Sequence, residues 1–317
     1  MDSVALDLMV LLGGLLLLGK GGDWLVDGSA ELARRRGVRP VIVGLTIVAW
    51  GTSAPEVMIS SLAAAEGRPA LALGNVLGSN IANIGLVLGV CALALPTLLQ
   101  RGLSAWEASW LVASVGCAWW ALADGAVSRG EGAALLAAFA LHNLNLWLLV
   151  RGAAGTAPGP ALQSAPWTRV VAGSIAIAIG AKLAVTGGVG VAEHIGISDR
   201  VVGLTIIALG TSLPELAAGL SGVLKNHSEL SLGNIVGSNV FNVLAVIGVA
   251  AVIAPLEPSA PEAVTSIDRA LGTDFPVVMG FSLALIFLSQ FAGASGGRWK
   301  GALLVASYLA YTWRVLV

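Results

Sequence analysis

The sequence has few charged residues for its length. Only 11% of its 317 residues are Asp, Glu, Lys or Arg, and 56% are hydrophobic, whereas soluble domains usually carry about 25% charged residues. A mean hydropathy of +0.88 and 41 glycines are typical of a polytopic helical membrane protein, because small residues let membrane helices approach closely. The net charge of -1 provides no basic surface for nucleic acid. The composition argues against a soluble protein and against a nucleic-acid-binding protein.

Cysteines and enzyme motifs are also scarce. The two cysteines, Cys91 and Cys117, lie in apolar runs without CxxC or Cys/His spacing, so we interpret them as buried free thiols. The apolar spans contain no GxSxG, HExxH or paired-aspartate arrangement, and the chain has no nucleotide-binding motif. These absences argue against an intramembrane hydrolase and against transport powered directly by ATP. We therefore expect no enzyme activity and no cofactor.

Long apolar runs occupy most of the chain. The N-terminal stretch MDSVALD lacks the basic region of a secretory signal, so we expect the first run to persist as a membrane helix. A helix needs about 20 apolar residues to cross a hydrocarbon core of about 30 Å. With this length as a guide, we expect ten spans: 3–34, 40–65, 70–97, 103–123, 131–150, 168–193, 200–223, 229–254, 276–292 and 301–316. The predicted fold class is an all-α integral membrane protein of about ten transmembrane helices.

Basic residues gather in alternate loops. They follow the first and third spans, flank the centre and recur later in the chain: Arg34, Arg35, Arg36, Arg39, Arg101, Arg151, Arg169, Lys225, Arg298 and Lys300. The positive-inside rule makes these loops cytoplasmic and both termini extracytoplasmic in the plasma membrane. The other loops are expected to hold mainly acidic residues: Glu66, Asp124, Glu131, Asp199, Glu257, Glu262, Asp268 and Asp274.

The two halves of the chain repeat each other. Residues 43–56, VGLTIVAWGTSAPE, match residues 202–215, VGLTIIALGTSLPE, at 11 of 14 positions without a gap. Residues 71–83 match residues 230–242 at 8 of 13 positions with the same offset of 159. This is an internal duplication. We divide the chain into a first five-helix repeat (1–151), a short cytoplasmic linker rich in Gly, Ala and Pro (152–166) and a second five-helix repeat (167–317).

The two copies are separated by five spans, an odd number, so they must cross the membrane in opposite directions. Inverted-topology repeats of this kind build secondary transporters, in which the ion site lies near the bilayer midplane where the copies meet. The sequence therefore predicts a transporter with a pseudo-twofold axis in the membrane plane.

Each copy places a glutamate inside an apolar helix, Glu56 in the first and Glu215 in the second. A lone charged carboxylate at the bilayer centre costs about 2.5–3.5 kcal/mol even on the lenient insertion scale. Pro55 and Pro214 precede the glutamates and each remove one backbone amide. We expect a kink at each proline that frees backbone carbonyls, those of Ala49 and Ala208 among them.

Further polar residues stand at helical spacing from these glutamates and in the partner segment. Hydroxyl and amide side chains recur in both copies: Thr52, Ser53, Ser79, Asn83, Thr211, Ser212, Ser238 and Asn242. Asn75 and Asn234 open the partner segments. Carboxylates, amides, hydroxyls and carbonyls without thiolate or imidazole suit the hard cations Na⁺ and Ca²⁺.

The motifs GTSAPE with GNVLGSNIAN, repeated as GTSLPE with GNIVGSNVFN, resemble the two alpha-repeats of the cation/calcium exchanger superfamily, most closely the prokaryotic sodium/calcium exchangers. The resemblance covers essentially the whole chain. It implies four central ion sites, with Glu56 and Glu215 bridging Ca²⁺ and Na⁺. By the same resemblance the hydroxyl and amide residues above and the carbonyls of Ala49 and Ala208 complete the sites, and the long first and sixth helices slide over a rigid core.

The chain departs from some relatives at Asn242, where potassium-dependent exchangers and some prokaryotic ones carry aspartate. Asn at this position leaves two central carboxylates and argues against potassium co-transport. The leading hypothesis is Na⁺/Ca²⁺ antiport, with the bilayer and the two ions as the only expected partners. A proton/calcium antiporter is the near alternative, since buried glutamates can also carry protons. A channel is an alternative of a different class.

Other polar residues receive structural interpretations. Thr46, Thr205, Ser60 and Ser61 are expected to bond carbonyls of their own helices. Asp23 and Asp27 either line an ion path or, as we prefer, form a paired helix face near Lys20. His142 lacks an acidic partner in sequence and is not expected to relay protons. The tryptophans Trp106, Trp110, Trp119 and Trp120 are interpreted as interfacial anchors.

Overall fold

A computed structural model of the chain describes residues 2–152, 166–195, 208–257, 261–290 and 297–316. These residues are almost entirely helical, as a chain must be when lipid offers no partner for its backbone polar groups. Within those ranges the only β pairing is an isolated antiparallel bridge between Val127 and Leu256. The predicted all-α membrane fold is confirmed.

The first half of the chain runs from α1 to α8. Its elements are α1 (Asp2–Arg36), α2 (Pro40–Val43), the π-helical segment η1 (Gly44–Val48), α3 (Ala49–Thr52), α4 (Ala54–Ala65), α5 (Pro69–Ala82), the π-helical segment η2 (Asn83–Leu88), α6 (Gly89–Ala94), the 3₁₀ helix η3 (Leu98–Arg101), α7 (Ala105–Ala121) and α8 (Arg129–Gly152).

The second half runs from α9 to α17. Its elements are α9 (Pro166–His194), α11 (Ala208–Gly210), α12 (Leu213–Leu224), α13 (Ser228–Phe241), the π-helical segment η5 (Asn242–Val246), α14 (Ile247–Ile253), α15 (Pro261–Arg269), the π-helical segment η6 (Ala270–Asp274), α16 (Phe275–Gln290) and α17 (Arg298–Leu316). The predicted span 200–223 begins outside the described residues, as does most of the linker, so the proposed domain boundaries stay a prediction.

These elements group into about ten crossings. Six described helical runs are each long and apolar enough to span a membrane, and the bent run from Pro40 to Ala65 makes a seventh. The shorter helices α7, α11 with α12, and α17 supply the others. The start of one span was predicted wrongly. The run that ends with α16 begins at Pro261, so Glu262, Asp268 and Asp274 lie in a helix and not in a loop. Proline favours a helix start, and the charges of α15 occupy one face of an amphipathic helix.

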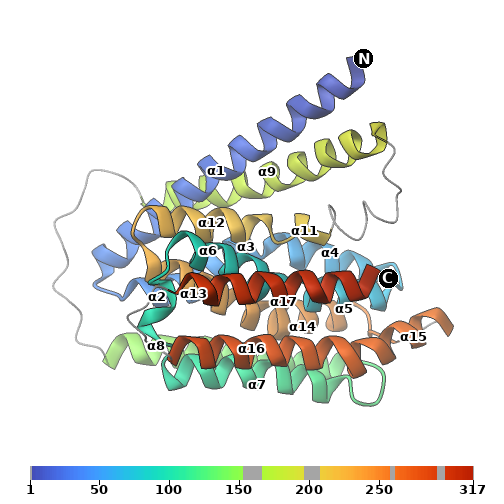
Figure 1. The fold of residues 1–317 in the computed structure, drawn as a ribbon. Helices are drawn as coiled ribbons and strands as arrows, with labels where there is room; N and C mark the ends of the chain where they lie inside the picture. The colour runs from blue at the N-terminus through green and yellow to red at the C-terminus, as the bar shows by residue number, and fades with distance from the viewer. Residues whose placement is uncertain (1, 153–165, 196–207, 258–260, 291–296, 317) are drawn as a thin grey trace.

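The helices of the repeated motifs occupy the centre of the bundle. In the runs 69–94 and 228–253, 78% and 83% of the most apolar stretch is buried, compared with 17% in α1. Figure 1 shows α1 and α9 side by side and inclined to the other helices, with both chain ends at the same end of the bundle. An even number of crossings requires this placement of the ends.

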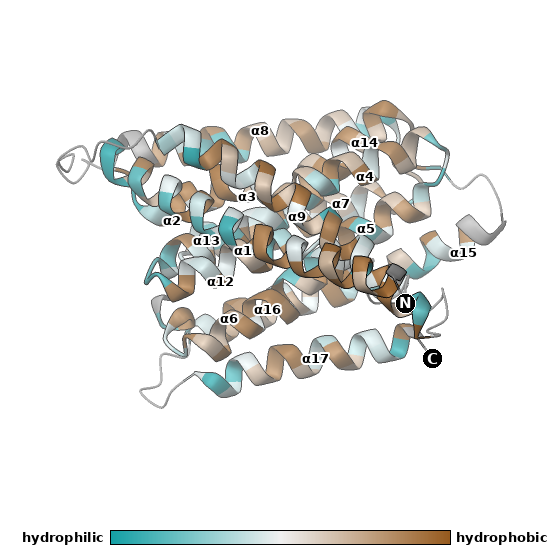
Figure 2. Cartoon of the chain, turned by 90° about the horizontal axis from the view of Figure 1, so that it is seen from above, coloured by the Kyte–Doolittle hydropathy of each residue, from teal (hydrophilic) through white to brown (hydrophobic). Residues whose placement is uncertain are grey.

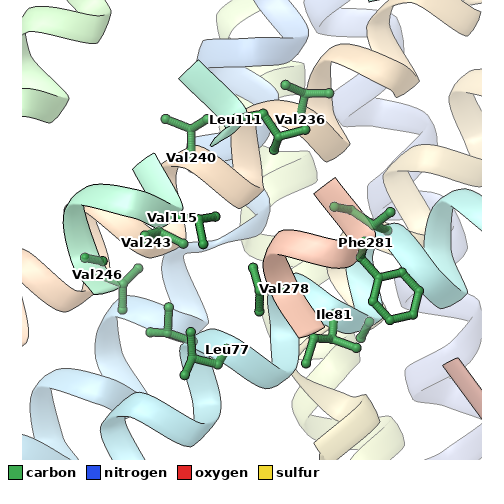
Figure 3. Packing of buried hydrophobic residues seen from close by; sticks show 14 of the residues in the cluster. Leu77, Ile81, Leu111, Val115, Val236, Val240, Val243, Val246, Val278 and Phe281 are labelled. Carbon is green, nitrogen blue, oxygen red and sulfur yellow. The ribbon is translucent and has the colours of Figure 1, made fainter. Parts of the chain in front are cut away.

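Aliphatic side chains from several helices fill the core between these elements. Figure 3 shows Leu77 and Ile81 of α5 facing a group that α7, α13, η5 and α16 contribute: Leu111, Val115, Val236, Val240, Val243, Val246, Val278 and Phe281. Figure 2 shows hydrophilic residues mostly near the ends of the bundle and hydrophobic residues along the helices. Both cysteines are free; Cys91 is buried as predicted, but Cys117 is exposed. Its exposure on an outer helix suits an apolar thiol that faces lipid.

Candidate functional site

The chain bends at the proline of the first repeated motif. The axes of the helices on either side of Ser53 differ by 48°, which confirms the kink predicted at Pro55. Ser53 and Ser212 have the same φ of -91°, and each precedes the first turn of a new helix, α4 or α12. Glu56 and Glu215 lie in these first turns. A helix N-terminus stabilises negative charge, so the broken helices provide a favourable place for two buried carboxylates.

The kink does not free the carbonyl of Ala49 as expected. The amide of Ser53 donates to Ala49 O at 3.0 Å, and the Thr52 hydroxyl oxygen lies 3.3 Å from the same carbonyl oxygen. The chain therefore closes the turn that the proline was expected to open. In the second repeat, the amide of Ser212 donates to Leu209 O at 3.0 Å, one residue later than the equivalent bond. Ala208 lies at the start of α11.

Hydroxyl groups join the two repeats through a set of polar contacts at the centre of the bundle. The Ser53 hydroxyl donates to Glu215 Oε1 at 2.8 Å, and the Thr52 hydroxyl donates to Asn234 Oδ1 at 3.2 Å. Thr52 also lies 3.4 Å from the hydroxyl of Ser238. The hydroxyls of Ser79 and Thr211 are 3.2 Å apart. Side chains that the sequence singled out in separate repeats thus meet in one buried cluster.

These contacts obey a pseudo-twofold relation. The offset of 159 residues converts the Thr52–Ser238 contact into the Thr211–Ser79 contact, and both are present. Asn80 and Asn239 are themselves 159 apart, and Asn80 Nδ2 donates to Asn239 O at 3.1 Å. A residue touches its own symmetry mate only near the axis, so the axis passes beside these asparagines.

The repeats also run in opposite directions. In Figure 1 the order of α3 and α4 leads toward the end of the bundle that holds the chain termini, whereas α11 and α12 lead away from it. The labels of α5 with α6 and of α13 with α14 are reversed in the same way. The predicted inverted topology is therefore seen in the described helices.

Many buried oxygen and nitrogen atoms at this centre have no hydrogen-bond partner among the described residues. Glu56 and Glu215 are both fully buried. The atoms without a hydrogen bond to the described residues include both carboxylate oxygens of Glu56, Oε2 of Glu215, the amide atoms of Asn83 and Asn242, and Oγ of Ser212. Buried polar atoms are nearly always satisfied, so such a set points to a bound ion or solvent. All-oxygen donors with two negative charges fit a hard cation.

The chemistry of the centre is limited to oxygen ligands and two carboxylates. In the described part of the chain, no group of three or more His, Cys, Asp or Glu side chains could hold a metal. A divalent cation at this place would therefore take its charge compensation from Glu56 and Glu215 and its remaining ligands from hydroxyls, amides and carbonyls. Such weak neutral ligands suit an ion that must also leave.

Two features of the site were missed by sequence reasoning. The π-helical segments η2 and η5 begin at the equivalent residues Asn83 and Asn242. A π-helical turn often marks a functional position, but no sequence pattern announces it. The axial contact of Asn80 with Asn239 was also missed, although both belong to the repeated motif.

Several secondary predictions can be compared with the structure. Thr46 donates to Ile42 O at 2.8 Å, as expected for a threonine inside a helix. Ser60 instead donates to Ala72 O of the neighbouring helix at 3.3 Å. Thr205 lies outside the described residues. Ser61 Oγ is buried without a bond in the part of the chain that the structure describes.

Aromatic residues near His142 also differ from the sequence interpretation. Trp106 stacks on His142 with ring centres 5.0 Å apart, and Trp110 contacts it edge-on at 4.9 Å. These two tryptophans line a buried histidine, while Trp120 is 73% exposed as expected for an interfacial anchor. Trp119 stacks on Phe275.

Asp23 and Asp27 form the predicted paired face, but with a different partner. Lys225 lies 2.8 Å from Asp27 and 3.3 Å from Asp23. Lys20, which is nearer in sequence, makes neither ion pair. The actual partner is on α12's C-terminal end, almost 200 residues away, and no local pattern could reveal it.

The comparisons with known proteins agree on one kind of protein. A family model described as sodium/calcium exchanger protein matches residues 6–148 and 166–317. The candidate antiporter CaxA of Alkalimonas amylolytica is 40% identical over 95% of this chain and 96% of its own length. The sodium/calcium exchanger MaX1 of Methanosarcina acetivorans is 30% identical over 97% and 98% of the two chains. A solved structure of the sodium-calcium exchanger NCX_Mj has a TM-score of 0.78 and 30% identity, and the match covers 97% of this chain and 98% of that one.

Proposed function

The chain belongs to the sodium/calcium exchanger protein family, and on that premise we propose that it exchanges Na⁺ for Ca²⁺ by alternating access. Its relatives are multi-pass membrane antiporters and not enzymes. The choice of Na⁺ as counter-ion is supported by the names of MaX1 and NCX_Mj. A proton-coupled calcium antiporter is the alternative that the experiment below separates from it.

One observation carries the proposal. Glu56 and Glu215 come from opposite repeats, are fully buried, and lie among oxygen atoms that have no partner within the described residues. Two opposed carboxylates neutralise one Ca²⁺, and hydroxyl and amide oxygens complete its coordination. We assign the transported ions to the predicted residues of both repeats: Glu56, Glu215, Thr52, Ser53, Ser79, Asn83, Thr211, Ser212, Ser238, Asn242 and the carbonyls of Ala49 and Ala208.

The charge of the site sets the coupling that we propose. Two glutamates and neutral Asn83 and Asn242 give a charge of -2. One Ca²⁺ brings the loaded site to zero, and three Na⁺, as the family resemblance implies, bring it to +1. Exchange is then electrogenic, and potassium has no third carboxylate to bind.

The orientation proposed for the chain rests on its basic loops. Loops rich in Arg and Lys face the cytoplasm, so both termini lie on the extracytoplasmic side of the plasma membrane. Both chain ends lie at one end of the bundle, as this orientation requires (Figure 1).

Calcium uptake by reconstituted vesicles tests the proposed counter-ion. Vesicles loaded with Na⁺ and diluted into Na⁺-free medium should take up Ca²⁺, and vesicles with a pH gradient but no Na⁺ should not. Uptake driven by the pH gradient alone would establish proton coupling instead. Uptake that needs neither gradient would establish a channel.

A further inference from the structure

The packing of α1 against α9 extends the internal repeat beyond the two repeated motifs. Glycines at intervals of seven residues face the partner helix, and members of the two sets are 159 residues apart: Gly14, Gly21 and Gly28 with Gly173, Gly180 and Gly187. A Cβ atom on Gly14 would lie 2.8 Å from Gly180 O, and one on Gly173 would lie 2.8 Å from Gly21 O. These two close approaches are symmetry mates. The offset of 159 residues therefore also relates α1 to α9.

A group of polar contacts joins α1 to the C-terminal end of α12. Lys225 caps the C-terminal end of α12 and contacts Asp27 at 2.8 Å and Asp23 at 3.3 Å. The Ser221 hydroxyl also donates to Asp23 at 2.7 Å. A groove of about 460 Å³ runs along these helices and is lined by Leu15, Leu216 and other residues of α1 and α12. Beside it, α1 approaches α12 closely at Gly22, where a Cβ atom would lie 2.8 Å from Ala217 O. Polar contacts, and not close packing alone, hold α1 in place here.

The symmetry-related positions carry the same pair with its charges exchanged. The offset of 159 residues converts Asp23 into Lys182 and Lys225 into Glu66. Glu66 caps α4 as Lys225 caps α12. The sequence thus provides residues of opposite charge at both places. The acidic residue lies on α1 in the first pair, and the basic residue lies on α9 in the second pair.

Only one of the two pairs is formed in this conformation. Among the residues that the structure describes, Lys182 has no ion-pair partner, and its side chain is exposed. Glu66 lies 3.8 Å from Arg68. Helix α1 packs along α12, whereas α9 has no comparable contact with α4 in the described ranges. The helices α4 and α12 end at opposite ends of the bundle (Figure 1).

We propose that Asp23–Lys225 and Lys182–Glu66 are alternate latches of the transport cycle, one closed in each access state. This rests on the alternating-access antiport proposed above. In an inverted-repeat transporter the two states exchange the conformations of the repeats. The latch formed here must then open as its counterpart closes. An interaction present in only one state shifts the equilibrium toward that state.

The two latches are unequal. Asp27, the second acidic partner of Lys225, corresponds to Thr186, so Glu66 has a single basic counterpart in the other state. The Lys225 latch therefore holds two acidic residues and favours the conformation described here. Since the pairs are partly exposed, each should change the ratio of the two states by about two- to fivefold.

Distances between spin labels on α4 and α9 test the proposal. Leu62 and Leu183 are exposed and lie on these helices near Glu66 and Lys182. We would label Leu62→Cys and Leu183→Cys in a Cys117→Ser background, where the remaining Cys91 is buried. Measurements without Na⁺, Ca²⁺ or any gradient report the conformational equilibrium and not transport.

Neutralising Lys225 and neutralising Glu66, the residues at the C-terminal ends of α12 and α4, should change the distance between α4 and α9 in opposite directions. Lys225→Gln should raise the population with a short distance between α4 and α9, and Glu66→Gln should lower it. Lys182→Gln added to Glu66→Gln should cause no further change, because both remove one pair. Glu66→Lys should lower the short-distance population, and Lys182→Glu added to it should restore that population.

Shifts in the same direction, or no shift in variants that elute from gel filtration like the parent protein, would overturn the latches. Failure of sodium-driven calcium uptake with correct distance shifts would instead overturn the proposed function alone.

Discussion

The two halves of the ion site have nearly the same sequence but different hydrogen bonds. In one half Glu215 receives the Ser53 hydroxyl at 2.8 Å. In the other half the equivalent Ser212 and both oxygens of Glu56 have no bond to the described residues. Two nearly identical motifs therefore adopt different local hydrogen-bonding states in one molecule. This is what an alternating-access transporter requires, since each repeat must be able to take the conformation of the other.

A single sequence difference contributes to this asymmetry. Asn75 Nδ2 donates to Ser60 Oγ at 2.9 Å and to Glu56 O at 3.4 Å. The position equivalent to Ser60 is Gly219, so Asn234 Nδ2 has no such acceptor among the described residues. Asn234 Oδ1 accepts the Thr52 hydroxyl of the other repeat. Asn75 is thus tied to its own repeat, while Asn234 bonds across to the other. Because this sequence difference affects only one repeat, we expect the two access states of the proposed transporter to differ in free energy.

The largest expected effect is a loss of calcium uptake that is the same whichever half of the ion site loses its glutamate. Glu56→Gln and Glu215→Gln should each lower sodium-driven calcium uptake by at least about 100-fold, because an amide supplies oxygen but no charge to a divalent ion in low dielectric. Flux in vesicles checks the effect, and gel filtration checks folding. Glu193→Gln, a change of an exposed glutamate on α9, is the control and should transport normally. Near-normal flux in either site variant would remove that glutamate from the site.

The next largest effect is a difference in stability between equivalent variants in the two halves of the ion site. Without ions, Ser53→Ala should lower the free energy of unfolding by about 1.5–3 kcal/mol, because Glu215 loses a donor to a buried charged group. Ser212→Ala should change it far less, since Ser212 makes no side-chain bond to the described residues. Thermal unfolding of the two ion-free variants gives the comparison. Equal losses would show that the asymmetry seen here is absent in solution.

A smaller effect concerns the origin of the asymmetry. Ser60→Ala should cost about 1 kcal/mol of unfolding free energy and release Asn75 from its own repeat. Gly219→Ser is the reciprocal change, although its Cβ would lie 3.2 Å from Cys91 Sγ and require a small shift. Calcium affinity should change less than tenfold in Ser60→Ala. A loss as large as that of Glu56→Gln would mean that Ser60 itself binds the ion.

Much of the fold follows from local sequence, and the asymmetry does not. The repeat, the kink at Pro55, and the opposed directions of the copies were predictable from apolar spacing, proline chemistry and an odd number of spans. The expectation that the kink frees the Ala49 carbonyl was wrong, because the amide of Ser53 still donates to this oxygen. A carbonyl oxygen has a second lone pair, which is the one that the proposed ion site would use. The bond of Ser53 to Glu215, without its counterpart from Ser212, could not be predicted, since the residues are the same in both repeats. It depends on how the repeats lie against each other.

The smallest expected effect is none at all. Replacement of potassium by an inert cation should leave sodium-driven calcium uptake unchanged, because Asn83 and Asn242 provide no third carboxylate. Asn242→Asp is the matched variant that adds one. A potassium requirement in the wild-type protein would show that another group supplies the missing charge.

The central claim is that the ion site carries two negative charges, one from each repeat, so that one Ca²⁺ and three Na⁺ load it differently. Calcium uptake into sodium-loaded vesicles under a clamped membrane potential tests this most directly. One positive charge then leaves the vesicle in each cycle, and the potential contributes up to about 2.3 kcal/mol per 100 mV. We predict that an inside-positive potential speeds uptake and an inside-negative potential slows it. Uptake that depends on the sodium gradient but is indifferent to the clamped potential would contradict the account.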